Sequence, residues 1–144
     1  MMILQYPKDK ATLRQKSVRV DKAPQDLIDE MAQYKGQCLG LAAIQLGLPI
    51  RVIMVKYGDD YIFMVNPELT MASKKTYDAK EGCLSISYGK ALFTMTRHKI
   101  VKVQYTDLEG NRRAIKARDL DASCLQHEID HLEGKLISDY SQHS

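Results

Sequence analysis

Apolar residues recur at helical spacing near the C-terminal end of the chain. Between residues 121 and 137 they follow intervals of three, four, three and four positions, and the set is Ala122, Leu125, Ile129, Leu132 and Leu136. This spacing gathers them on one side of an amphipathic helix that would pack on a hydrophobic core. Gly134 weakens the last turn. The sequence therefore predicts a C-terminal helix over residues 121–137.

A shorter helical pattern covers residues 24–34. Leu27, Ile28 and Met31 recur at helical spacing. Pro24 suits the first turn, where the missing N–H costs no hydrogen bond, and Gly36 is placed to end the helix. These features predict a second helix near the N-terminus.

Two segments between the helices have the patterns of β-hairpins. Residues 50–57 and 61–65 are rich in β-branched and aromatic side chains and are separated by turn residues 58–60, and Asn66 with Pro67 is expected to end the second strand. Residues 101–105 alternate between apolar and polar, and turn residues 107–111 precede another strand that runs through Ile115. The second hairpin should therefore be half exposed.

These elements predict an α+β fold in which antiparallel strands pack around the C-terminal helix. The chain has 144 residues, with neither an internal repeat nor a linker, so we expect one domain over residues 1–144. The charge of +3 arises from 21 basic and 18 acidic residues that form no basic block, which favours neither a specific nucleic acid nor a membrane surface as partner. The chain has neither a long apolar stretch nor a signal-peptide pattern, which indicates a cytoplasmic protein.

The predicted C-terminal helix carries the motif His127-Glu128-Ile129-Asp130-His131. Two histidines four positions apart differ by ~40° around a helix axis, so both imidazoles can reach one point. Cys124 and Glu128 lie on the same side as the histidines. An arrangement of this kind binds a metal, although the same residues would also suit the solvent-exposed face of a surface helix.

A catalytic metal usually has three protein ligands and an open position for water. Downstream of His131, neither Glu133 nor Asp139 matches a metalloprotease spacing. The three cysteines cannot all pair with one another, so they are best interpreted as reduced thiols. Cys83 is the strongest upstream candidate for the third ligand. Gly82 lets the backbone approach the metal closely, and a thiolate is a strong metal ligand. Alternatively, Cys83 is a small buried apolar residue. Cys124 could instead complete a closed, structural Cys₂His₂ site.

Three segments now allow a comparison with a known family. Residues 39–45 (LGLAAIQ), 81–85 (EGCLS) and 126–131 (QHEIDH) resemble the three motifs of peptide deformylases, in the same order. The resemblance extends to residues 3–7, to Arg97 and to residues 107–110, so it covers nearly the whole chain.

The resemblance implies a hydrolase that removes the formyl group from formylmethionine at the N-terminus of newly synthesised proteins. Cys83, His127 and His131 would hold one divalent metal, commonly Fe²⁺ in this family, with Zn²⁺ or Ni²⁺ also able to occupy the site. N-formylmethionyl peptides and nascent chains would be the partners, with transient contact to the ribosome.

The resemblance also assigns roles to further residues. Glu128 would act as the general base toward a metal-activated water, and Gln45 and the backbone N–H of Leu84 would donate to the oxyanion. The substrate-binding residues would be Leu39, Gly40 and Gly82 for the peptide backbone, and Leu120 and Cys124 for the methionine side chain.

Two other classes of function fit the same motifs. A peptidase could use the same His-Glu-x-x-His chemistry, and a deformylase-like protein could bind peptide N-termini or a structural metal without turnover. The chain also departs from the usual family pattern at three positions: Cys38 and Asp119 replace glycines, and Ser87 replaces a proline. We expect these three residues to surround the substrate groove and to affect efficiency and side-chain preference.

Overall fold

The computed structural model describes residues 2–139 and 142–143. Its helices are α1 (Lys10–Leu13), α2 (Gln25–Ala32) and α3 (Asp119–Leu132), with short 3₁₀ helices η1 (Ala43–Leu46), η2 (Ser87–Gly89) and η3 (Ile137–Asp139). The strands are β1 (Gly40–Ala42), β2 (Val52–Tyr57), β3 (Asp60–Ala72), β4 (Thr76–Glu81), β5 (Phe93–His98), β6 (Ile100–Thr106), β7 (Arg112–Arg118) and β8 (Gln142–His143). None of the described helices is both long and apolar enough to cross a membrane.

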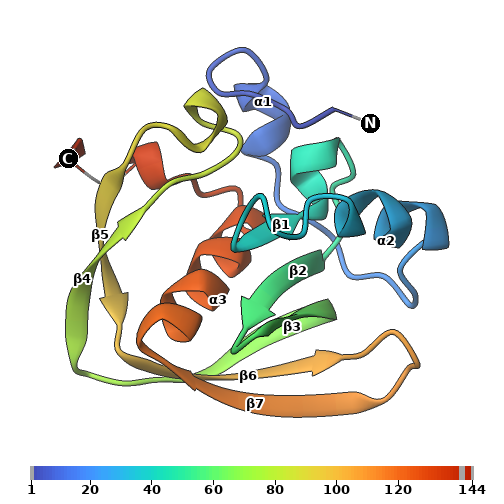
Figure 1. Cartoon of the computed structure of the whole chain (residues 1–144). Helices are drawn as coiled ribbons and strands as arrows, with labels where there is room; N and C mark the ends of the chain where they lie inside the picture. Colours follow the sequence, from blue (N-terminus) through green and yellow to red (C-terminus); the bar gives the residue numbers. More distant parts are fainter. Residues whose placement is uncertain (1, 140–141, 144) are drawn as a thin grey trace.

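The strands form two antiparallel sheets around α3, which confirms the predicted α+β fold. One sheet has the order β1-β2-β3-β6-β7 and the other has the order β4-β5-β8. Figure 1 shows α3 in the middle of the molecule, with β4 and β5 on one side and β1 and β2 on the other. The helix that carries the histidines therefore lies inside the fold.

Helix α3 begins two residues before the predicted start and ends five residues before the predicted end. It stops at Leu132 because Gly134 takes a left-handed φ of +75°, which ends the helix instead of only weakening its last turn. Leu136 remains buried but follows the helix. Helix α2, in contrast, starts one residue later than expected, because Pro24 is its N-cap and not its first helical residue.

Both predicted hairpins are present, but the second strand of the first one is longer than expected. Strand β3 does not end at Asn66 and Pro67 but continues to Ala72. Asn66 has a φ of +51°, and the register with β6 shifts between Val65 and Glu68. This bulge accommodates Pro67, whose missing N–H would interrupt a regular ladder.

Strand β2 is apolar on both faces because it lies between two parts of the core. Ile53 and Val55 pack in a cluster with α3, whereas Val52 and Met54 pack in a cluster with α2. Strands β4 and β5 were not predicted from the sequence. They pair along their whole length and form one wall beside α3.

Candidate active site

Helix α3 places His127, Glu128 and His131 in the interior of the protein. All three side chains are buried, and His131 is only 1% exposed. The alternative that they form a solvent-exposed helix face is therefore wrong. The opposite side of the helix packs into the core, so both faces of α3 are covered.

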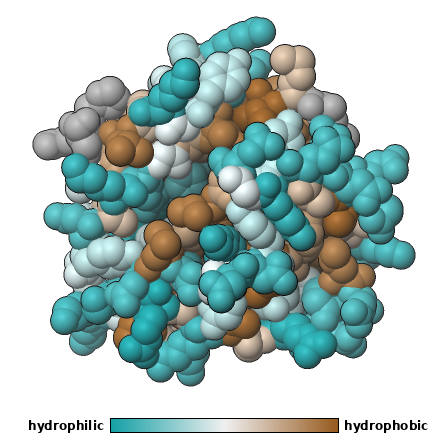
Figure 2. Space-filling model, viewed as in Figure 1, coloured by the Kyte–Doolittle hydropathy of each residue, from teal (hydrophilic) through white to brown (hydrophobic). Residues whose placement is uncertain are grey.

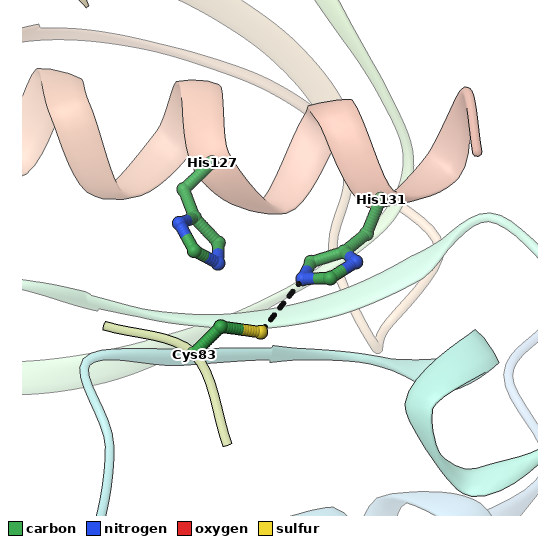
Figure 3. Close-up of side chains that lie close together, drawn as sticks. All are labelled: Cys83, His127 and His131. Atoms are coloured by element: carbon green, nitrogen blue, oxygen red, sulfur yellow. Dashed lines mark hydrogen bonds between the residues drawn. The ribbon is translucent and has the colours of Figure 1, made fainter. Parts of the chain in front are cut away.

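Cys83 approaches the two histidines from the loop that follows β4. A turn in this loop, in which the N–H of Ile86 donates to the carbonyl of Cys83 at 2.8 Å, brings the thiol under the helix. Its Sγ lies 3.4 Å from Nε2 of His131. Figure 3 marks this contact with a dashed line. One potential ligand atom from each of Cys83, His127 and His131 lies within 4.8 Å of the other two.

This geometry suits a metal ion. In a tetrahedral zinc site, Zn–S and Zn–N bonds of about 2.3 and 2.0 Å put the two ligand atoms roughly 3.5 Å apart. The observed distance between Cys83 and His131 agrees with that value. Within the described ranges, this is the only group of three such residues, and Cys124 is not part of it. The geometry thus gives no support to a closed Cys₂His₂ site.

A buried network of charges holds His127 in position. Nδ1 of His127 lies 2.8 Å from Oε1 of Glu81, which leaves Nε2 available to bind a metal. The guanidinium of Arg97 donates two hydrogen bonds of 2.7 Å to Glu81 and a third of 2.7 Å to Asp130. Sequence reasoning had assigned no role to Glu81 or Arg97, although Glu81 begins one of the motifs.

The site attracts positive charge and keeps one histidine neutral. Burial lowers the pKa of His131 well below its usual value, so that its imidazole is in the form that binds metals. Burial would also lower the pKa of His127, but the charge of Glu128 and the hydrogen bonds with Cys83 and Glu81 raise it well above the usual value. Negative groups around His127 thus favour a cation, either a proton or a metal.

The carboxyl group of Glu128 points into the same space. Burial raises its pKa to about 7. Oε1 of Glu128 is buried and has no hydrogen-bond partner in the described part of the chain. A Cβ atom on Gly40 would lie 2.5 Å from Oε2 of Glu128, so only glycine leaves room for this carboxyl group. The side chain is therefore free to meet a water molecule or a substrate.

Two hydrogen-bond donors lie next to Cys83. Gln45 is 1% exposed and is fixed at both ends, because its Oε1 accepts from the N–H of Ala42 at 2.9 Å and its Nε2 donates to Oγ of Ser85 at 3.0 Å. The same Nε2 lies 3.6 Å from Sγ of Cys83. The backbone N–H of Leu84 has no acceptor among residues 2–139 and 142–143. Both groups can donate to a negative oxygen beside the three potential ligands.

A cavity of about 460 Å³ lies between β1, β4 and the N-terminal half of α3. Strands β1 and β4 are at the ends of their two sheets, so two strand edges face this cavity. The sequence-predicted residues that line it are Leu39, Gly40, Gln45, Gly82, Cys83, Leu84, Leu120, Cys124, His127 and Glu128. On the face of the molecule seen in Figure 2, apolar side chains gather near the middle among hydrophilic ones. An extended peptide with an apolar side chain would fit such a groove.

The three departures from the family pattern have different positions. Cys38 lines the cavity, whereas Ser87 and Asp119 do not, although Asp119 precedes the cavity residue Leu120. Asp119 has a φ of +55°, a conformation that favours glycine. Ser87 has a φ of +50°, which proline cannot adopt. Of the three residues expected to surround the groove, only Cys38 lines the cavity itself.

Replacing Arg97 by methionine should destabilise the protein strongly. Arg97 is 5% exposed, and its loss would leave the buried Glu81 with His127 as its main partner. Breaking a buried ion pair from one side commonly costs about 3–5 kcal/mol in the free energy of unfolding. Denaturant unfolding in the presence of a chelator would measure the change in the free energy of unfolding. Arg113→Met, which breaks an exposed pair with Asp107, is the matched control. Equal stabilities of the two variants would show that the network contributes little.

Comparisons with known proteins agree with this geometry. The family model described as polypeptide deformylase matches residues 1–144. A peptide deformylase from Bartonella tribocorum is 40% identical in an alignment of length 131, which covers 85% of this chain and 72% of the relative. A peptide deformylase from Nitrosococcus oceani is 35% identical, in an alignment that covers 96% of this chain and 84% of the relative.

The fold leads to the same family. A peptide deformylase from Ehrlichia chaffeensis, solved in complex with actinonin, superposes with a TM-score of 0.88 at 32% identity, over 97% of this chain and 87% of that protein. The alignments cover most of each relative's length, and the solved relative has the same fold as this chain. The chain therefore belongs to the polypeptide deformylase family, whose members are metal-dependent hydrolases.

Proposed function

We propose that the chain, as one catalytic domain over residues 1–144, removes the N-formyl group from formylmethionine at the start of newly made proteins. The observation that carries this proposal is the convergence of Cys83, His127 and His131 within 4.8 Å, beside a buried and unpartnered carboxyl oxygen of Glu128. A nascent chain is attached to the ribosome while it is made, so this substrate also implies transient contact with the ribosome.

Cys83, His127 and His131 would hold one divalent metal. When bound, the metal would act as a Lewis acid and make water nucleophilic near neutral pH. One thiolate and two imidazoles suit zinc, iron or nickel, and the family resemblance favours Fe²⁺. Glu81 and Arg97 would keep His127 turned so that Nε2 faces the metal.

The side chains around this site would divide the work on the formyl group. Glu128 would take the proton from the attacking water on its carboxylate and deliver it to the leaving nitrogen. A pKa of about 7, raised by burial, suits a group that must both accept and release a proton. The Nε2 of Gln45 and the N–H of Leu84 would donate to the oxygen that becomes negative as the formyl carbon is attacked.

The peptide itself would lie along the cavity as an added strand. Leu39 and Gly40 on one side and Gly82 on the other offer backbone groups at the two strand edges. A Cβ atom on Gly82 would lie 2.9 Å from the carbonyl oxygen of Gly89, so this position has no room for a side chain. Cys124 and the 58% exposed Leu120 would contact the methionine side chain.

Release of formate from formyl-Met-Ala-Ser, by protein purified without oxygen, tests the function. The metal content should be measured on the same sample. A peptidase would release amino acids from unformylated Met-Ala-Ser, and a protein that only binds peptides would release nothing from either. Because the E. chaffeensis relative was solved with actinonin, this compound should also compete with the substrate. Absence of formate release from metal-loaded protein would overturn the proposal.

Replacing Cys38 by glycine should raise kcat/KM on formyl-Met peptides, by no more than the ~10–200-fold typical of one small group in a pocket. Cys38 lines the cavity, and its Sγ donates to the carbonyl of Tyr34 at 3.5 Å. Burial and the nearby Glu128 raise the pKa of its thiol to about 12, so its bulk rather than its charge matters. Metal content should not change. A fall in kcat/KM would show that Cys38 contacts the substrate favourably.

A further inference from the structure

The N-terminal segment of the chain donates hydrogen bonds to Gln45 and Leu84, the two residues proposed as oxyanion donors. The N–H of Leu4 donates to the carbonyl of Gln45 at 2.8 Å, and the N–H of Tyr6 donates to the carbonyl of Ser85 at 2.7 Å. Between them, Nε2 of Gln5 donates to the carbonyl of Leu84 at 2.7 Å. Three successive residues thus hold both η1, which carries Gln45, and the loop that carries the N–H of Leu84.

Gln5 is itself held firmly on its other side. Its N–H donates to Oδ2 of Asp9 at 2.8 Å, and its carbonyl accepts from the N–H of Asp9 at 2.6 Å. The side chain therefore starts from a fixed backbone position and ends on Leu84. An unrestrained surface side chain would lose more rotamer freedom on making the same bond.

The hydrogen bond from Gln5 holds the carbonyl of Leu84, which belongs to the peptide unit after the one that contains the N–H of Leu84. Leu84 lies between Cys83 and Ser85 in a tight turn, in which its N–H has no acceptor among the described residues. A hydrogen bond to the carbonyl of Leu84 limits rotation about its ψ angle, and the bond from Tyr6 to Ser85 limits the next peptide unit. Together they fix the turn and, with it, the direction of the N–H of Leu84.

We propose that Gln5 is a positioning residue, which aligns the N–H of Leu84 with the negative oxygen of the transition state. The inference rests on the proposed function, since it assumes that Leu84 is an oxyanion donor. Donors of this kind act through preorganisation, and a small misplacement can cost a large part of their effect. Gln5 is not among the residues that line the cavity, and the hydrogen bonds of its side chain go to the carbonyls of Ile3 and Leu84 and not to the potential metal ligands.

Gln5→Met and Gln5→Glu test this role on the metal-loaded full chain. Methionine preserves the size of the side chain without a donor, and glutamate preserves its shape but carries a charge instead of a donor. We expect kcat for formate release to fall about 10-fold or more for Gln5→Met, with KM and metal content unchanged, because the lost alignment matters only in the transition state. In Gln5→Glu, kcat should fall further than in Gln5→Met, since the carboxylate of the glutamate would repel the carbonyl of Leu84.

Gln15→Glu is the matched control, because Gln15 is exposed in the same N-terminal region and its side chain has no hydrogen bond to another described residue. It should retain the kinetics of the parent protein. A normal kcat for Gln5→Met would overturn the positioning role. Loss of metal, or a fall in kcat explained by a lowered melting temperature, would likewise overturn it in favour of a structural role. Failure of the parent protein itself to release formate would instead reject the proposed function.

Discussion

Glu128→Gln should lower kcat for formate release by about 10²-fold or more while leaving the metal bound. The amide has the shape of the carboxyl group but cannot accept a proton. The space beside Gly40 is just large enough for this side chain, so an isosteric substitution should not disturb the helix. Steady-state kinetics, with metal content and melting temperature measured on the same samples, would show the effect.

Glu133→Gln is a suitable control for this experiment. Glu133 follows the same helix but pairs with Arg51 outside the cavity. The same chemical change there should leave kcat unaltered. If Glu128→Gln kept a near-normal rate, the proton would have to be carried by another group, and the role proposed for Glu128 would be rejected.

The histidine helix was predictable because its signal is local. The spacing of Leu125, Ile129 and Leu132 is enough to orient α3, and the same period places His127 and His131 together. Cys83 could be selected only through its motif, because a lone cysteine has no local pattern that distinguishes a ligand from a core residue. Its position beside His131 depends on the fold, because the two residues are 48 positions apart in the sequence.

The supporting parts of the site were less predictable because they depend on distant contacts. Strand β4 has few apolar residues and lies at a sheet edge, so its sequence lacks the pattern of a buried strand. The register of β4 with β5 places Glu81 opposite Phe93 and Arg97 opposite Tyr77, so the ion pair between Glu81 and Arg97 does not follow from strand pairing. The need for glycine at position 40 arises from Glu128, which belongs to a different element. None of these requirements can be read from neighbouring residues.

Cys83→Ala should remove most of the metal and reduce formate release to near background. The substitution leaves two imidazoles, and a catalytic metal normally needs three protein ligands. It also deletes the thiolate, which is the strongest of the three donors toward zinc or ferrous iron. Metal analysis after gel filtration, per mole of folded chain, would measure the loss.

Cys124→Ala provides the comparison that separates ligation from general loss of a buried thiol. Cys124 is buried in the same cavity wall, but it does not belong to the group formed by Cys83, His127 and His131. It should therefore retain its metal. In cobalt-loaded protein, the sulfur-to-metal absorption should persist in Cys124→Ala and disappear in Cys83→Ala. Full metal retention in Cys83→Ala, or loss of that absorption in Cys124→Ala, would mean that the thiolate ligand has been assigned to the wrong cysteine.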